Sequence, residues 1–343
     1  LIYVPGTYAK TDEVVALAAV AGKHGGIYAT HMRDEGNGVV EAIRESIEIG
    51  EKANLPVEIS HFKISSKKLW GASPTTIGLV KSARERGLQV TVDQYAYTAS
   101  STSLDVRLPD WALAGGRAEG SKRLADPPTR ARIIKEMKED LKKSKFKDYS
   151  YAVVTSYVPK PEYNGKNIRE IAKMARGKDN LDAQIEQILE MYAAGGSGMV
   201  YHVMDENDLQ NIMREPFTMI GSDSSVRKFG EGVPHPRGYG NNARVLGRYV
   251  RELKVLTLED AIRKMTSLPA QTFGLGDRGL IRENFAADFV LFDEKTINDT
   301  ATFSNPHQYP TGISHVFVNG VPVFADGQMT KERPGVPLRH VSY

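Results

Sequence analysis

Residues 27–61 read IYATHMRDEGNGVVEAIRESIEIGEKANLPVEISH, and this stretch decides the fold class. A short run of residues ends at His31, and a second run, 56–60, ends at His61. Between the two runs, the apolar side chains of 39–53 recur at helical spacing. A strand, a helix and a second strand in this order are typical of a parallel βαβ unit with a right-handed crossover.

The same alternation continues outside this stretch and predicts an α/β fold with four parallel strands. These strands are expected to begin at Ile27, Pro56, Leu88 and Phe217 and to lie side by side. A (β/α)₈ barrel of the TIM type needs eight strands. Either the sheet is open, or the chain holds the second half of a barrel whose first half lies upstream of Leu1. The start at Leu1 rather than Met favours the second alternative.

Four parts can be distinguished along the chain. In the second alternative, residues 1–97 are expected to carry barrel βα units and 204–276 the end of the barrel. Residues 98–203 break the alternation, with helical patterns at 129–142 and 168–193, and are expected to form an inserted lid segment. Residues 277–343 are rich in short strands and turns and are expected to be part of a small β-sandwich domain. Asn319-Gly320 between alternating apolar residues predicts a hairpin there.

Composition excludes several classes of protein. The chain has 343 residues, 41% of them hydrophobic, and a net charge of +3 from 45 basic and 42 acidic residues. There is no cysteine, so the chain holds no disulfide and no thiolate metal ligand. Without an apolar run of membrane-spanning length, a cytoplasmic location with no membrane partner is expected. The basic stretch 135–147 is interleaved with acids in its first half, which favours a solvated helix face over a nucleic-acid site.

Two histidines and a carboxylate follow the predicted strands. His31 and His61 end two successive strands, and Asp223 follows the strand that begins at Phe217. Carboxyl ends of parallel strands converge on a ligand in such folds. Either histidine alone is more typical of a structural role, but equivalent positions on two strands indicate a shared Zn²⁺ site. Asp223 would be a third ligand or a general base, and a turn-forming role is its non-catalytic alternative.

Further polar residues lie near the same strand ends. Arg237 ends the proline-stiffened Pro234-His-Pro-Arg run and suits bidentate carboxylate recognition, although a surface arginine is the plain alternative. His202 and His235 are weaker metal candidates. Lys63 stands two residues after His61. These residue types together indicate a metal-dependent hydrolase.

At these residues the sequence resembles the D-aminoacylase (N-acyl-D-amino-acid deacylase) branch of the amidohydrolase superfamily. The resemblance covers nearly the whole chain and implies the barrel and lid described above. The motifs that carry it are Tyr28-Ala-Thr-His-Met-Arg-Asp-Glu-Gly36, Ile59-Ser-His61, Asp93-Gln-Tyr95, Ile220-Gly-Ser-Asp223, His235-Pro-Arg237, Arg244-Val-Leu-Gly-Arg-Tyr249 and Ala286-Ala-Asp-Phe-Val-Leu-Phe-Asp293.

The resemblance also implies roles for single residues. His31 and His61 would hold one tightly bound zinc ion, with a second, weaker ion allowed, and Asp223 would be the catalytic base. The substrate contacts implied by the resemblance are Lys63, Tyr95, Ser101 and Arg237, with the arginine on the substrate carboxylate. The family's first-strand His-x-His motif and its cysteine ligand would lie upstream of Leu1.

The implied activity is zinc-dependent hydrolysis of an N-acyl-D-amino acid to a carboxylate and a free D-amino acid. Two alternatives stay open from the residues. One is a cyclic amide hydrolase of the dihydropyrimidinase kind, and the other is a non-catalytic binding protein or an inactive fragment. Departures from the family pattern at Ala96, Ser224 and Asn242-Ala243 are expected to change the shape of the substrate pocket rather than the chemistry.

Overall fold

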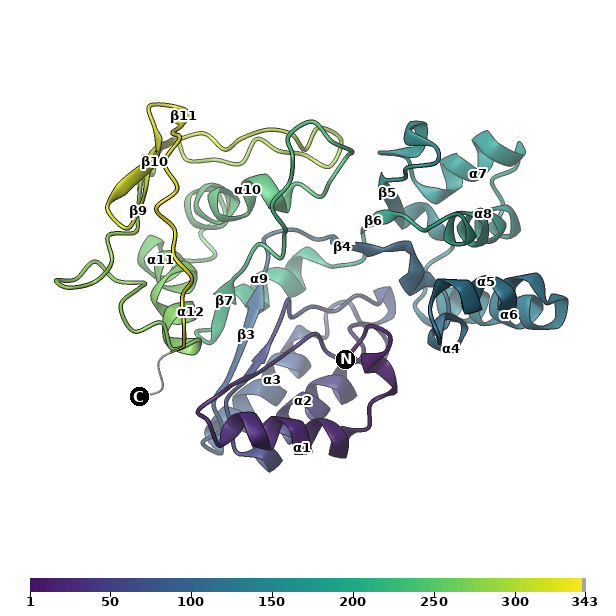
Figure 1. Cartoon of the computed structure of the whole chain (residues 1–343), viewed down its shortest axis with the longest axis horizontal. Helices are drawn as coiled ribbons and strands as arrows, with labels where there is room; N and C mark the ends of the chain where they lie inside the picture. Colours follow the sequence, from purple (N-terminus) through teal and green to yellow (C-terminus); the bar gives the residue numbers. More distant parts are fainter. Residues whose placement is uncertain (341–343) are drawn as a thin grey trace.

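A four-stranded parallel sheet lies at the centre of the structure, a computed structural model that describes residues 1–340 (Figure 1). The strand order is β1-β2-β3-β7, and each neighbouring pair is parallel. Thr30 of β1 pairs with Ile59 of β2, which pairs with Val92 of β3. The prediction of four adjacent parallel strands is therefore confirmed. The strands are β1 (Tyr28–Thr30), β2 (Val57–Ile59), β3 (Val90–Gln94) and β7 (Thr218–Ile220).

Three helices pack side by side against this sheet. The predicted helix between the two histidines is α2 (Val39–Ala53), and it ends at Asn54, which adopts a left-handed conformation with φ 50°. Its apolar stripe, including the fully buried Ile43, packs with strand residues into one hydrophobic cluster. Figure 1 shows α1, α2 and α3 together along the lower part of the molecule. The flanking helices are α1 (Thr11–Gly22) and α3 (Ser73–Glu85).

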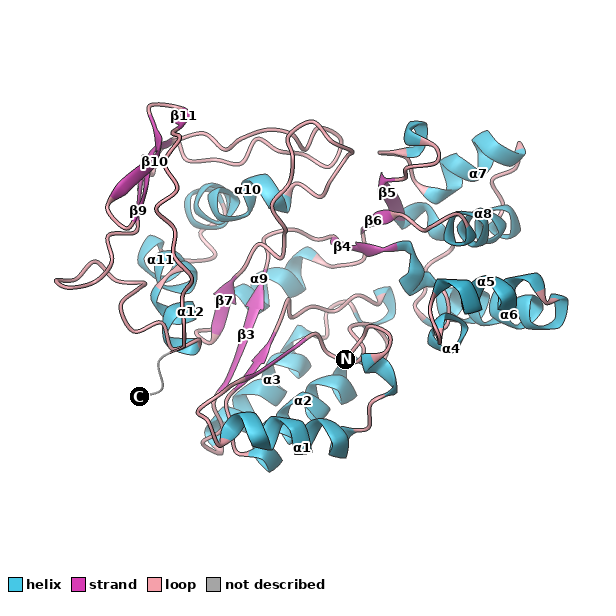
Figure 2. Ribbon diagram, viewed as in Figure 1, coloured by secondary structure: helices cyan, strands magenta, loops and turns pink. Residues whose placement is uncertain are grey.

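A second, antiparallel sheet forms within residues 98–203, in the order β4-β6-β5 (Figure 2). Five helices group around it. The pattern at 168–193 is divided into two helices because Gly177, with φ 68°, ends the first of them. The strands are β4 (Ser100–Ser103), β5 (Ala152–Ser156) and β6 (Gly198–Tyr201), and the helices are α4 (Asp110–Leu113), α5 (Arg117–Ala125), α6 (Pro127–Lys143), α7 (Ile168–Arg176) and α8 (Leu181–Ala193).

The chain then returns to the parallel sheet. A polar loop after β7 leads into α10, which continues directly into a π-helical segment, η6. The elements are α9 (Glu206–Arg214), α10 (Arg237–Arg244), η6 (Val245–Glu252), α11 (Leu258–Met265) and α12 (Ser267–Thr272). Short 3₁₀ segments lie elsewhere: η1 (Gly6–Tyr8), η2 (Lys67–Leu69), η3 (Leu104–Arg107), η4 (Tyr149–Tyr151) and η5 (Pro161–Tyr163).

The last strands form an antiparallel sheet in the order β11-β10-β9-β8. Asn319 (φ 49°) and Gly320 (φ 78°) make the turn between β9 and β10, so the predicted hairpin is confirmed. Among residues 1–340, no helix has both the length and the apolarity needed to cross a membrane. The strands are β8 (Phe289–Phe292), β9 (Ile313–Val318), β10 (Val321–Ala325) and β11 (Gln328–Met329).

Candidate active site

The predicted site residues leave the carboxyl edge of the parallel sheet in unusual backbone conformations. His31 follows β1 directly, His61 follows β2, and Asp223 follows β7. His61 has φ 40° and Asp223 has φ 48°, both in the left-handed region. For residues other than glycine this region costs of order 1–3 kcal/mol and persists only where the surroundings fix it. The fold therefore holds these two side chains in place against a local preference.

The two histidines lie against each other. His31 Nδ1 faces His61 Nε2 in direct contact, and the rings stack with centroids 4.5 Å apart. His61 is buried, whereas His31 is exposed. The protein covers part of the His31 ring, and this partial burial lowers the pKa of His31; the neighbouring His61 lowers that pKa further. A lowered pKa favours the neutral form of His31, which is the form of an imidazole that binds a metal.

Glu35 connects His61 to Lys63. Glu35 Oε1 lies 2.9 Å from His61 Nδ1 and 2.7 Å from Lys63 Nζ, and Lys63 also donates to the His61 carbonyl at 2.9 Å. Burial alone would raise the pKa of Glu35, but Lys63 and His61 outweigh it and hold that pKa at about 2. The carboxylate is thus ionised and fixes the outer nitrogen of the buried histidine. Glu35 is a site residue for which the sequence pattern predicted no role.

The local sequence explains why Glu35 was missed. Three consecutive charged residues, Arg33, Asp34 and Glu35, come shortly after His31. The first two bind main-chain groups outside the site. Arg33 pairs with Glu45 at 2.8 Å and binds two main-chain carbonyls. Asp34 accepts from the amides of Gly36 and Gly38. Nothing in the order of these three residues indicates which side chain turns toward His61.

Asp223 and Arg237 form an ion pair. Arg237 Nη1 lies 2.9 Å from Asp223 Oδ2, and the guanidinium is buried over the ring of Tyr95, 4.4 Å from its centroid. Arg237 Nη2 also donates to the Ser101 carbonyl at 3.4 Å. The Ser101 hydroxyl itself donates to Met199 across the β4–β6 pair. Tyr95, Ser101, Asp223 and Arg237 are thus brought together.

His235 serves the loop that carries Arg237. Its Nε2 contacts the Ala99 carbonyl at 2.9 Å, and its Nδ1 accepts from the Arg237 amide at 3.0 Å. Burial holds the pKa of His235 well below its ordinary value. His202, the other weaker metal candidate, packs edge-on against Phe303, with ring centroids 4.7 Å apart. Neither histidine joins the pair at the strand ends.

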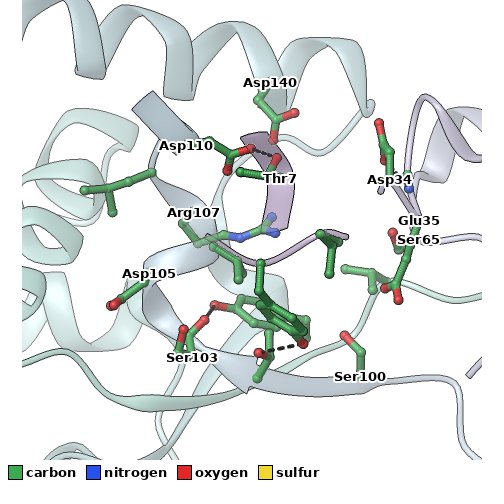
Figure 3. A pocket seen from close by; sticks show the side chains of 18 of the residues that line it. Thr7, Asp34, Glu35, Ser65, Ser100, Ser103, Asp105, Arg107, Asp110 and Asp140 are labelled. Carbon is green, nitrogen blue, oxygen red and sulfur yellow. Dashed lines mark hydrogen bonds between the residues drawn. The ribbon is translucent and has the colours of Figure 1, made fainter. Parts of the chain in front are cut away.

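A cavity of about 1030 Å³ is lined by several of the predicted site residues and extends to Ser100 and Ser103 of β4 and to Arg107 of η3 (Figure 3). The predicted site residues that line it are His61, Lys63, Tyr95, Ser101 and Asp223. Within residues 1–340, no three or more His, Asp or Glu side chains converge as a metal set. The facing nitrogens of the two histidines suit two ligands of one ion, so the donor chemistry fits zinc in part.

Comparisons with known proteins agree with this architecture. The model of the amidohydrolase family matches residues 182–324. D-aminoacylase of Alcaligenes xylosoxydans xylosoxydans is 36% identical over 97% of this chain, and N-acyl-D-glutamate deacylase of the same organism is 34% identical over 99%. The chain spans 59% of the length of each of these two relatives.

Solved structures give the same result. A crystal structure of D-aminoacylase superposes with a TM-score of 0.78 at 35% identity, over 98% of this chain and 61% of that one. N-acyl-D-glutamate deacylase from Bordetella bronchiseptica, complexed with zinc and a phosphonate inhibitor, gives 0.75 at 31% identity, over 96% and 61%. Another D-aminoacylase structure is described by its binuclear metal centre. The first of these structures is described as defining a subset of the amidohydrolases, and the second contains zinc.

Proposed function

We propose that the protein hydrolyses the amide bond of N-acyl-D-amino acids. The proposal is supported by the similarity of nearly the whole of this chain to D-aminoacylase and N-acyl-D-glutamate deacylase. The products would be the carboxylic acid of the acyl group and a free D-amino acid. One observation carries the proposal: the His31–His61 pair and the Asp223–Arg237 pair meet at the carboxyl edge of one parallel sheet.

His31 and His61 would hold the metal, which we propose to be Zn²⁺. Bound zinc supplies Lewis-acid polarisation of the acyl carbonyl and makes water acidic enough to act as a nucleophile near neutral pH. The contact of Glu35 Oε1 with His61 Nδ1 orients the imidazole, since the outer nitrogen of a metal-binding histidine generally donates to a carboxylate. Glu35 is therefore a positioning residue in this proposal.

Asp223 would move the proton. As general base it takes a proton from the attacking water, and it then delivers that proton to the amine nitrogen as the C–N bond breaks. Its Oδ2 is held by Arg237, which fixes the direction of the carboxylate. About one third of the Asp223 side chain is exposed, and it lines the cavity, so substrate can approach it.

The remaining residues would bind the substrate's α-carboxylate. Arg237 offers a guanidinium buried beside Tyr95 and the Ser101 carbonyl, and Lys63 offers a buried ammonium that lines the cavity. A planar guanidinium binds a carboxylate with two parallel hydrogen bonds, which also sets the substrate's orientation. This geometry would select a linear N-acyl amino acid over a ring that has no free carboxylate.

The test compares full-length protein loaded with Zn²⁺ and the same protein treated with a chelator. N-acetyl-D-amino acids, their L enantiomers and a hydantoin are supplied in parallel, and the free amine is measured. We expect release from the D substrates by the zinc-loaded protein alone. Ring opening of the hydantoin without hydrolysis of any N-acetyl-D-amino acid would contradict the proposal and favour the cyclic amide alternative.

A further inference from the structure

The side chain of Asn241 lies between the ends of two neighbouring parallel strands. Asn241 is buried and belongs to α10. Its Oδ1 accepts from the Ala96 amide at 2.8 Å, and its Nδ2 donates to the Gly221 carbonyl at 3.2 Å. Ala96 comes two residues after the end of β3, and Gly221 comes directly after the end of β7. One side-chain amide therefore joins the two strands where they leave the sheet.

This amide takes the place of one hydrogen bond of the parallel ladder. Gln94 pairs with Ile220, and the Gly221 amide donates to the Gln94 carbonyl at 3.1 Å. In a regular parallel pair the next bond would run from the Ala96 amide to the Gly221 carbonyl. Both of these groups bind Asn241 instead. The strands are thus spaced apart at this point by an inserted amide group.

The two strand ends that Asn241 joins carry candidate active-site residues. Tyr95 comes directly before the bonded main-chain amide, and Asp223 comes two residues after the bonded carbonyl. Arg237, four residues before Asn241 on α10, pairs with Asp223 at 2.9 Å and lies over the Tyr95 ring. Residues four apart share one face of a helix. One face of α10 therefore spaces the strand ends and brings a guanidinium into contact with a residue from each.

The last residue of α10 is held on the same strand end. Arg244, three residues after Asn241, donates from Nε to the Ala96 carbonyl at 2.8 Å and pairs with Asp299 at 2.9 Å. Asp299 also accepts from the Tyr97 hydroxyl at 3.2 Å. Ala96 is thus fixed through both its amide and its carbonyl by side chains of one helix.

A primary amide suits this place because it offers a donor and an acceptor on one planar group. A buried main-chain group without a partner is costly, so the strand ends should shift when the amide is removed. We propose that Asn241 is a positioning residue that holds Tyr95 and Asp223 at the separation at which Arg237 contacts both. Asn241 acts through these residues and not on the substrate. This inference rests on the proposed function and specifies how its site is held.

The test measures kcat/KM of wild type and Asn241→Ala for an N-acetyl-D-amino acid and its methyl ester. Only the free acid uses Arg237 and Asp223 together, so its hydrolysis depends on their relative positions. We expect the preference for the free acid to fall by roughly 10- to 100-fold, since a displacement of about 1 Å can cost about 100-fold in rate. Loss of folded protein lowers both rates equally and leaves this preference unchanged. An equal fall for the two substrates would therefore overturn the proposal.

Two further variants assign the effect to the bridging amide. Asn241→Asp keeps the size and the acceptor but turns a second acceptor toward the Gly221 carbonyl, so it should also lower the preference. It carries the test if Asn241→Ala does not fold. Asn180→Ala is the matched control, because Asn180 Oδ1 accepts from the Ala183 amide at 3.0 Å within the insert. This control should leave the preference unchanged, and a loss equal to that of Asn241→Ala would contradict the assignment.

Crystal structures of full-length wild type and Asn241→Ala separate this inference from the proposed function. If wild type hydrolyses no N-acyl-D-amino acid, the proposed function fails, but the strand ends of the two proteins can still be compared. We expect Tyr95 and Asp223 to shift relative to each other by on the order of 1 Å, the scale of displacement that affects catalysis, and the contact of Asp223 with Arg237 to break. Unchanged positions, with water in place of the amide group, would overturn the inference.

Discussion

Arg237 Nη1 lies 2.9 Å from Asp223 Oδ2, so the expected substrate clamp and the expected base are one ion pair. Because the guanidinium is buried, it has few other positions to adopt. A substrate carboxylate that binds Arg237 therefore also affects the direction of the Asp223 carboxylate. Because of this coupling, even a substitution of Arg237 that preserves its charge is expected to lower the activity.

Arg237→Lys should lower kcat/KM by roughly 10-fold or more, because lysine keeps the charge but not the planar two-pronged geometry. The measurement uses a free N-acetyl-D-amino acid and its methyl ester, which offers no α-carboxylate. Most of the loss should disappear with the ester. If both substrates respond equally, Arg237 acts on Asp223 or the loop and not on the substrate.

His31→Ala or His61→Ala should remove bound zinc from the purified protein, as measured by elemental analysis, because each substitution deletes one of the two facing nitrogens. His202→Ala is the matched control, since His202 packs against Phe303 away from the pair. Stoichiometric zinc in either strand-end variant would refute the ligand assignment.

Glu35→Gln should weaken zinc binding by roughly 10- to 100-fold, the usual effect of losing the carboxylate that orients a metal-binding histidine. The apparent zinc affinity is measured by competition with a chromophoric chelator. Asp34→Asn is the control, because the neighbouring carboxylate caps the amides of Gly36 and Gly38 and does not contact His61. Equal effects of the two substitutions on zinc affinity would show that Glu35 does not act by orienting the His61 imidazole.

Much of this site could be predicted from the sequence, because short apolar runs mark the ends of the strands. The runs before His31, His61 and Asp223 placed these residues at one edge of the sheet, where the structure has them. Contacts made between distant segments were not visible. Asn241 binds the Ala96 amide, 145 residues earlier in the chain, so its position between the two strands appears only after folding.

The helix boundaries could also be predicted from the sequence only in part. The helix at 39–53 was predicted with its observed bounds, since its apolar stripe is regular. The pattern at 168–193 is also regular in its apolar positions, yet Gly177 ends α7 and Asn180 caps α8. Gly177 adopts the left-handed conformation that commonly ends a helix, and α7 then packs against α8.

Lys264 provides a test of the fold at alkaline pH. Its side chain is buried, and its Nζ donates to the carbonyls of Glu215 and Thr218, at the start of β7. Burial lowers the pKa of Lys264 to about 8 from 10.5. Between these two values the unfolded chain binds more protons than the folded protein, so the contribution of Lys264 to stability rises with pH.

The free energy of unfolding of wild type relative to Lys264→Met should therefore increase by roughly 2 kcal/mol between pH 8 and pH 10. Urea unfolding of both proteins at the two pH values measures this difference, and the comparison cancels the titration of other groups. A constant difference between the two proteins would mean that the ammonium keeps its ordinary pKa in the fold.

The most direct test of the whole account uses racemic N-acetylglutamate and the zinc-loaded protein, followed to completion by chiral chromatography. The account predicts that hydrolysis stops when half of the substrate is consumed, that the free glutamate is the D enantiomer, and that the remaining N-acetylglutamate is the L enantiomer. Release of L-glutamate, or complete hydrolysis of the racemate, would contradict it.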